Sequence, residues 1–287
     1  IWITYDSNID KNDMSDSQSV LKKIKKVINY AKKNATVIIS TQLPLGSLRK
    51  LENYIYKINR KNELIYIPEN LRLGNSVKLF LNPDRLIVGS RDIKKIKPIV
   101  QKLLKNIKCE KIFVSPETAE MTKHVINSYL ACSVSFINEI GNISKKFDIP
   151  FDELEVCVKS DGRIGKKAYL KIGNPFSGGT LARDLNFINQ LAKKYNSNRT
   201  LIKSIIKSNL IHSNWIINTF NKLNKNNQNK KVLIFGLGYK DNSSTIRRSL
   251  SYDIFEKLKN KYLTKIKDDF IFKNSSEVNK IKHYFIT

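Results

Sequence analysis

The first 114 residues alternate short segments typical of β-strands with longer segments typical of helices. The strand-like segments are rich in apolar and β-branched residues and fall at 1–4, 36–40, 63–67, 85–89 and 111–114. Helical periodicity lies between several of them, at about 19–33, 48–59 and 93–104. Parallel strands need long crossover connections, and these are usually helices. The pattern therefore predicts an α/β domain built on a parallel sheet.

Two polar turns follow strands of this predicted sheet. Residues 40–46, STQLPLG, follow the second strand, and residues 68–74, PENLRLG, follow the third. Parallel sheets bind ligands at the carboxyl ends of their strands, so Thr41 and Glu69 are candidate site residues. Ordinary turn chemistry also accounts for the proline and glycine in each turn, and the turns alone leave both interpretations open.

Residues 115–147 are predicted to form one long helix, because apolar residues recur at helical spacing and no proline interrupts residues 117–147. Lys123 and Asn127 are four residues apart and so lie one turn above each other, with Asn138 near the same line. One interpretation is a core helix whose Lys123 reaches solvent and whose Asn127 bonds locally. The other is a polar binding face.

The segment 115–222 is predicted to be helical apart from one loop, residues 160–184. This loop has five glycines and one proline among 25 residues, so its backbone can turn sharply and approach a ligand closely. Arg163 offers a planar fork for phosphate or sugar oxygens, and Arg183 and Asp184 close the loop. A structural linker is the alternative, although loops of this length are usually functional or disordered.

A second α/β unit is predicted after the polar linker 223–230. A buried-strand segment, 232–235, runs into a glycine turn and is followed by a helix from about Leu250. Gly236 and Gly238 form an incomplete dinucleotide fingerprint, because Asp241 occupies the third glycine position. Basic residues after the turn could still hold a phosphate.

The net charge of +27 would ordinarily suggest a nucleic acid or an anionic membrane as a partner. Here the lysines occur in ones and twos along the chain, and no nucleic-acid-binding motif accompanies them. We therefore expect no specific nucleic acid partner. No segment has the length of a transmembrane span, and we expect no membrane partner.

Three cysteines without paired spacing predict a reducing compartment, hence the cytoplasm, and no metal site. Each of the three histidines is interpreted as a surface or internally satisfied residue.

Five motifs, in order, resemble the UDP-glucose/GDP-mannose dehydrogenases, a family of nucleotide-sugar dehydrogenases. STQLPLG is similar to the family's S-T-V-P-x-G turn, and PENLRLG with the later NPDR resembles P-E-F-L-R-E-G and N-P-D-R. AEMTKHVINSYLACSVSFINEI resembles the helix whose Lys and Asn grip the sugar. DGRIG with the following glycine loop resembles the R-I-G and G-G-S-C-x-x-K-D segments. FGLGYKDNSSTIRRS is similar to G-x-x-x-K-x-x-T-x-D-x-R-x-S, so the resemblance covers almost the whole chain.

The resemblance implies a partial Rossmann-like NAD-binding domain at 1–114, a central all-helical domain at 115–222 and the start of a second Rossmann-like domain, which binds UDP, at 223–287. The glycine-rich G-x-G-x-x-G turn is absent before Thr4, so we expect a fragment that lacks this half of the first domain. The family oxidises the sugar C6 alcohol to an acid with two NAD, through a thioester on a cysteine. The resemblance further implies a homodimer formed through the central helix and a nucleotide-sugar substrate that is UDP-linked rather than GDP-linked. It also implies a role in polysaccharide precursor supply.

The resemblance also implies roles for individual residues. Thr41 would orient water, Glu69 would be the hydrolytic base, and Lys123 and Asn127 would hold the C6 oxygen, with Asp184 supporting the nucleophile. Further residues would contact the substrate, namely Leu71, Arg72, Arg163, Phe176, Gly178 and Lys240. Four would contact the cofactor, namely Thr4, Thr41, Arg183 and Arg247.

The sequence departs from the family pattern at the nucleophile. Thr180 occupies the cysteine position, four residues before Asp184, and no cysteine lies elsewhere in the loop. A threonine hydroxyl is far less acidic than a thiol and cannot form the thioester. Leu73, Arg183 and Thr245 replace three further family residues. Three functions therefore stay open: a uronic-acid-forming dehydrogenase, a single-hydride nucleotide-sugar oxidoreductase, and an inactive nucleotide-sugar-binding homologue.

Overall fold

A computed structural model describes residues 1–5, 16–69, 71, 76–176, 180–227, 230–238, 245–246 and 249–286. The chain forms two compact units, Ile1–Ile126 and Asn127–Thr287. Four predicted site residues lie outside the described residues, namely Arg72, Gly178, Lys240 and Arg247. Within the described residues, no helix combines the length and the apolarity that crossing a bilayer requires.

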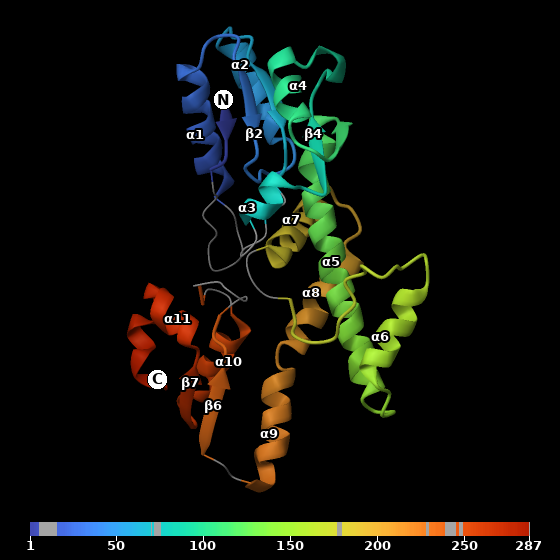
Figure 1. Ribbon diagram of the computed structural model, residues 1–287, viewed down its shortest axis with the longest axis vertical. Helices are drawn as coiled ribbons and strands as arrows, with labels where there is room; N and C mark the ends of the chain where they lie inside the picture. The colour runs from blue at the N-terminus through green and yellow to red at the C-terminus, as the bar shows by residue number, and fades with distance from the viewer. Residues whose placement is uncertain are drawn as a thin grey trace. The chain divides into compact units, whose positions relative to one another are not determined.

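The first unit alternates strands and helices, as the sequence predicts (Figure 1). Its elements are β1 (Trp2–Ile3), α1 (Ser17–Tyr30), β2 (Thr36–Ile39), α2 (Ser47–Lys57), β3 (Glu63–Tyr66), α3 (Ser76–Leu81), β4 (Arg85–Gly89), η1 (Ile93–Lys95), α4 (Pro98–Lys105), β5 (Glu110–Val114) and the start of α5 (Pro116–Ser144).

The strands form one sheet in the order β1-β2-β3-β4-β5. Three of its strand pairs are parallel, but β3 and β4 pair antiparallel, with Tyr66 opposite Gly89. The prediction of a parallel sheet is therefore wrong at this one pair. The described part of the β3–β4 connection contains only the short α3, and a six-residue helix spans about 9 Å. A strand of five residues spans about 17 Å, so α3 is too short to return the chain along the sheet.

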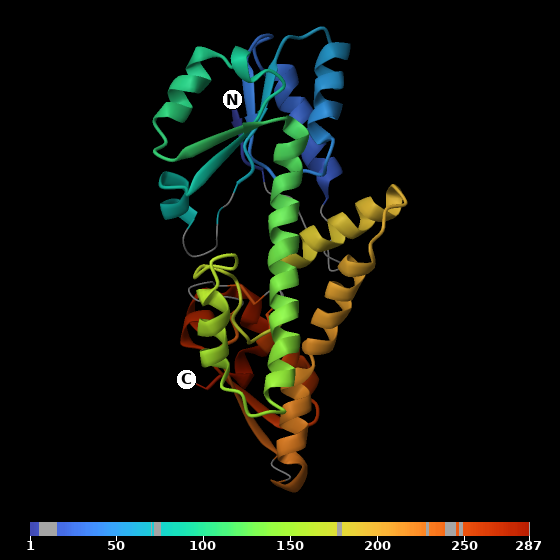
Figure 2. The ribbon, with the colours of Figure 1, turned by 90° about the vertical axis from the view of Figure 1, so that its right-hand side faces the viewer.

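Helices cover both faces of the sheet because its strands alternate apolar side chains between them (Figure 2). On β2, Val37 and Ile39 pack with buried residues of α1 and α2, whereas Ile38 packs with those of α4. The predicted helix 93–104 is divided, since Pro98 starts α4 and separates it from the short η1. At the carboxyl end of β4, Gly89 leaves room for the start of α5, because a Cβ atom there would lie 2.7 Å from the Ala119 Cβ atom.

The second unit contains most of α5, further helices and a two-stranded sheet. Its remaining elements are α6 (Phe151–Ser160), α7 (Leu181–Lys194), α8 (Thr200–His212), α9 (Trp215–Asn227), β6 (Lys231–Phe235), α10 (Leu250–Leu258), β7 (Leu263–Lys267), α11 (Asp269–Asn274) and η2 (Ser276–Tyr284). α5 has 29 residues, which confirms the predicted long helix. The strands β6 and β7 are parallel, which confirms the predicted α/β character of this segment.

Candidate active site

The STQLPLG turn connects β2 to α2, at the carboxyl end of β2. Thr41 is 3% exposed, and its hydroxyl oxygen has no hydrogen-bond partner among the described residues. Gly46 ends the turn with φ of +83°, a conformation that L side chains rarely adopt. A buried polar group without a partner is costly, so Thr41 offers a hydroxyl that a ligand or a water molecule can satisfy.

Residues of β3 and α5 fasten this turn. The Tyr66 hydroxyl donates to the Thr41 carbonyl oxygen at 3.2 Å and accepts from the Leu43 amide at 3.4 Å. Nε2 of the buried His124 lies 3.3 Å from the Leu43 carbonyl oxygen, which confirms the interpretation of this histidine as internally satisfied. The Glu120 carboxylate completes the attachment by accepting the Gly46 and Leu48 amides.

Lys123 and Glu69 form an ion pair in the first unit. Lys123 Nζ lies 3.0 Å from Glu69 Oε1, with the two side chains 11% and 40% exposed. Lys123 therefore does not reach into solvent, and this finding contradicts the interpretation of a core helix with an exposed lysine. The strands β1, β2 and β3 are parallel neighbours, so their carboxyl ends lie on the same side of the sheet. Thr4, Thr41 and Glu69 each follow one of these ends and therefore lie on that side.

Asn127 and Asp184 form a second polar cluster, which lies in the second unit. The Asn127 side-chain amide donates to Asp184 Oδ2, and Asp184 Oδ1 lies 3.6 Å from Nε of Arg183. Asp184 is fully buried in the first turn of α7. Asn127 thus pairs with a residue 57 positions away, which contradicts the alternative that it bonds locally.

Side chains of α5 and α8 anchor the glycine loop before α7. Asn138 accepts from the Gly173 amide at 3.0 Å and donates to the Asn174 carbonyl oxygen at 3.3 Å. Asn209 bonds both backbone groups of Phe176 at 2.9 Å. The described part of the loop, residues 161–176, is therefore an ordered segment attached to two helices. Gly141 on α5 makes room for it, since a Cβ there would collide with the Ile172 side chain.

Other predicted residues lie in more open surroundings. Thr180 is the exposed residue that precedes α7, and its side chain makes no capping hydrogen bond there. Arg163 pairs with Asp161 at 2.7 Å, with its side chain 90% exposed. Thr4 and Leu71 are also exposed. The three cysteines are free thiols at Cys109, Cys132 and Cys157.

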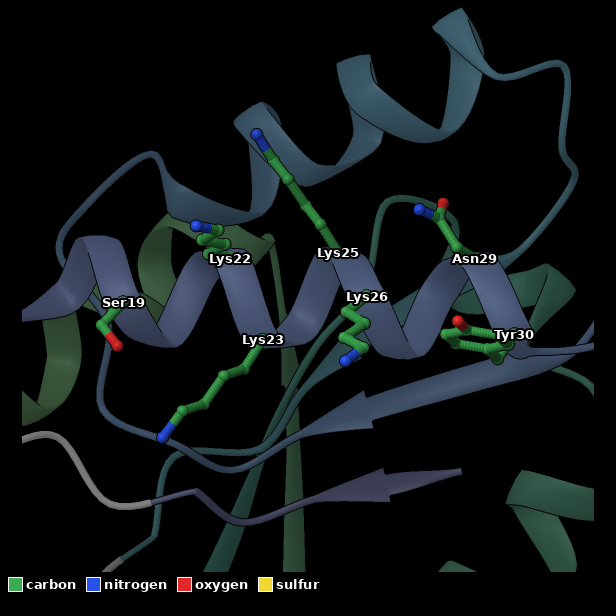
Figure 3. A pocket seen from close by; sticks show the side chains of 7 residues that line it. All are labelled: Ser19, Lys22, Lys23, Lys25, Lys26, Asn29 and Tyr30. Atoms are coloured by element: carbon green, nitrogen blue, oxygen red, sulfur yellow. The ribbon is translucent and has the colours of Figure 1, made fainter.

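A shallow basic depression lies on α1 and contains none of the predicted site residues. Figure 3 shows its lining of four lysines with two polar residues and one tyrosine, namely Ser19, Lys22, Lys23, Lys25, Lys26, Asn29 and Tyr30. α1 has no acidic residue, so this face is strongly positive. The Lys23 and Lys25 ammonium groups lie over the rings of Tyr5 and Tyr54. These lysines form a solvated helix face, and two of their ammonium groups make cation–π contacts.

The residues at the edge of the first sheet fit a polar nucleotide cofactor. An orphaned buried hydroxyl, Thr41, follows β2, and a partly exposed carboxylate, Glu69, follows β3. Both occupy the position where open α/β sheets bind their ligands. Two contacting residues were missed in the sequence, namely Tyr66 and Glu120. Glu120 gave a signal, because it lies three residues before Lys123 and hence on nearly the same face of the helix.

Comparison with known proteins agrees with these features. Residues 3–108 match the NAD binding domain of the UDP-glucose/GDP-mannose dehydrogenase family, and residues 117–210 match its central domain. UDP-glucose 6-dehydrogenase of Rickettsia prowazekii (strain Madrid E) is 28% identical over 265 residues, which cover 91% of this chain and 61% of that protein. UDP-glucose 6-dehydrogenase TuaD of Bacillus subtilis (strain 168) is 25% identical over 261 residues, 90% of this chain and 56% of the relative.

Solved structures share the fold. A UDP-glucose dehydrogenase from the archaeon Pyrobaculum islandicum matches with a TM-score of 0.87 at 20% identity, over 100% of this chain and 67% of the archaeal chain. A UDP-D-ManNAc dehydrogenase from Pyrococcus horikoshii matches with a TM-score of 0.80 at 19% identity, over 94% and 65% of the two chains. The fold is therefore that of the nucleotide-sugar dehydrogenases.

The two domain matches together cover most of the chain. It belongs to the UDP-glucose/GDP-mannose dehydrogenase family, as the five sequence motifs predict. The match to the NAD binding domain also confirms NAD as the cofactor class. The chain spans about three-fifths of the length of the curated relatives described above.

Proposed function

We propose that the protein containing this chain oxidises a UDP-linked sugar with NAD. The observation that carries the proposal is the Lys123–Glu69 ion pair, which lies within a family-matched region at the edge of the sheet. A lysine ammonium suits the oxidation of an alcohol, because it stabilises the negative charge that develops on the oxygen that loses its proton. The names of the relatives support a UDP-sugar substrate.

Each proposed role follows from the chemistry of the side chain. NAD, when bound, accepts a hydride from the sugar C6 carbon. The Lys123 ammonium holds the C6 oxygen and stabilises its developing negative charge. Thr41 orients a water molecule through its unpaired hydroxyl, and Glu69 takes a proton from water that attacks the oxidised carbon. Asp184 holds Asn127 in place through the hydrogen bond between their side chains.

Thr180 gives specific support to a second candidate, a single oxidation that releases the aldehyde. The family's second oxidation proceeds from a hemithioacetal on cysteine, and Thr180 offers only an alcohol at that position. One hydride then leaves with one proton, and the CH2OH group becomes CHO. If the acid does form, the aldehyde must instead be hydrated by water before the second hydride leaves.

The stoichiometry of NADH formation separates these functions. The complete polypeptide that contains this sequence is incubated with UDP-glucose, a UDP-N-acetyl sugar or GDP-mannose, and NADH is counted per sugar consumed. Two NADH per sugar indicate acid formation without a protein thioester, whereas one indicates release of the aldehyde. No NADH together with retained sugar binding would contradict dehydrogenase activity and favour the inactive binding homologue. A Thr180→Cys variant provides the matched control, because it restores the thiol of the family pattern.

We also propose that the protein forms a homodimer through α5. Tyr129, Phe136 and Ile143 are seven residues apart, hence on one side of the helix, and are 71%, 55% and 53% exposed. A stripe of exposed apolar side chains on a helix is typical of a protein interface. Sedimentation analysis tests this proposal: Phe136→Glu should dissociate the dimer, whereas Lys146→Glu, a charge reversal at an exposed position just after the end of the same helix, should not. A monomeric unsubstituted protein would refute it.

A further inference from the structure

Glu120 on α5 is a buried carboxylate whose two oxygens both accept backbone amides. Its side chain is almost inaccessible, with the residue 1% exposed. Oε2 accepts the Gly46 amide at 2.6 Å, and Oε1 accepts the Leu48 amide at 2.8 Å. Both amides lie at the N-terminus of α2, where backbone N–H groups have no partner within the helix. Glu120 is thus the cap of a helix to which it does not belong.

The sequence of the turn explains why this cap comes from a distant residue. A helix is usually capped by the side chain of its own N-cap residue, but the N-cap of α2 is Gly46, which has no side chain. The glycine is required there by the positive φ of the turn. Glu120, 72 to 74 residues further along the chain, supplies the missing acceptor. The cap therefore joins α5 to the turn that carries Thr41.

The same attachment sets the position of Lys123. Lys123 follows Glu120 by three residues, so both side chains project from nearly one side of α5. A carboxylate held by two amides fixes how α5 is rotated and where it lies along its axis. Lys123 is then directed to Glu69, at 3.0 Å. His124, the next residue, adds its contact to the Leu43 carbonyl oxygen in the middle of the turn.

We propose that Glu120 is a positioning residue that holds Thr41 and the Lys123–Glu69 pair in register. The catalytic part of this inference rests on the proposed dehydrogenase function, whereas the register itself is a property of the fold. Glu120 touches neither the substrate nor the reacting atoms. It acts through the turn and through α5.

The first test measures the register without any enzymatic activity. In the unsubstituted protein, the Gly46 and Leu48 amides should exchange slowly with D2O, compared with the Leu201 amide of α8, a helix whose N-cap makes no side-chain capping bond. Glu120→Gln should accelerate exchange at one or both amides by about tenfold to a hundredfold, the worth of a hydrogen bond to a charged group. It should also shift the methyl resonance of Thr41.

Glu117→Gln is the matched control, because Glu117 lies one turn earlier on α5 and pairs with Arg91 on the surface. This variant should leave the Thr41 methyl resonance and both amides unchanged. Fast exchange of Gly46 and Leu48 in the unsubstituted protein would overturn the proposal even if Glu120→Gln failed to fold. Equal effects of the two variants on the Thr41 resonance would overturn it as well.

The second test asks whether the register matters for turnover. Glu120→Gln should lower kcat at least about tenfold, a typical consequence of misplacing groups by a fraction of an ångström, while changing the KM for the sugar less than threefold. Glu120→Asp, which keeps the charge, should recover part of this loss. A proportionate fall in active protein with kcat per folded molecule unchanged would contradict a positioning role. An inactive unsubstituted enzyme would refute the proposed function but leave the register testable by exchange.

Discussion

The two polar clusters anchored on α5 differ in how completely their own residues satisfy them. In the first unit, Glu69 is 40% exposed beside Lys123, and the Thr41 hydroxyl has no partner among the described residues. In the second unit, Asp184 is 0% exposed and receives the Asn127 amide within its own unit. The first cluster retains hydrogen-bonding capacity for a ligand, whereas the second uses its capacity to join α5 to α7.

This difference has energetic consequences. Loss of Lys123 should cost little stability, because water can hydrate the partly exposed Glu69 carboxylate that remains. A fully buried carboxylate is different, since its desolvation is offset only by the groups that face it. Polar residues of one helix can therefore serve binding in one unit and folding in the other. Three predictions test this contrast, in order of their expected effect on the free energy of unfolding.

The largest effect is expected from Asp184→Ala. The substitution leaves the Asn127 amide and the Arg183 guanidinium without their carboxylate in a buried site, and breaking such a pair from one side costs about 3–5 kcal/mol. Urea denaturation followed by circular dichroism should show this loss as a lower midpoint at unchanged slope.

Asp161→Ala is the matched control for this change. Asp161 also pairs with an arginine, Arg163, but the Arg163 side chain is 90% exposed. Removal of the Asp161 carboxylate should therefore not measurably change the urea midpoint. If both variants were equally stable, Asp184 would not be the structural carboxylate that its burial indicates.

A smaller effect is expected from Glu120 and Glu117 on α5, whose contributions to the free energy of unfolding should change in opposite directions as pH changes. Burial raises the pKa of Glu120, although the Leu48 and Gly46 amides act to lower it. The folded state then binds the proton more tightly, so the contribution of Glu120 to stability falls as pH rises from about 4.3 through the raised folded pKa. The hydrogen bond from Arg91 lowers the pKa of Glu117, and its contribution is lost as pH falls through that lowered value.

Denaturation of Glu120→Gln and Glu117→Gln across about pH 3 to 7, the range of carboxyl titration, separates the two contributions. Relative to the unsubstituted protein, the first variant should lose a component that weakens with rising pH, and the second a component that weakens with falling pH. Identical pH profiles for both variants would mean that their different surroundings have no effect on folding.

The sequence predicted most of the architecture because strand and helix periodicities are local properties. The strands, the 29-residue α5 and the helix after 249 follow from such patterns. The antiparallel β3–β4 pair did not, since strand direction depends on the path of the whole connection. The division of helix 93–104 at Pro98 was readable in principle, because proline favours the first turn of a helix.

The site was predictable only as separate residues. Motifs pointed to Thr41, Glu69, Lys123, Asn127 and Asp184, but no local pattern shows that Lys123 meets Glu69 across 54 residues. Tyr66 escaped notice because it ends a mostly apolar strand, and a tyrosine there is expected from strand propensity alone. Contacts between distant elements, such as that of Glu120 with Gly46, depend on tertiary packing, which a single sequence does not encode in any short window.

The smallest effect on stability is expected where the effect on catalysis is largest, at Lys123. Lys123→Met keeps the length and the apolar stem of the side chain, and Glu69, with 40% of its side chain exposed, can be hydrated once the ammonium is gone. The free energy of unfolding should change by less than about 1 kcal/mol. If Lys123 stabilises the developing negative charge, kcat should nevertheless fall by about 100-fold to 1000-fold, the usual effect of removing such a group. Lys146→Met, at an exposed position in the turn just after the same helix, should alter neither quantity. A large loss of stability in Lys123→Met with unchanged kcat per folded molecule would reverse the comparison, because the first cluster would then serve folding as the second one does.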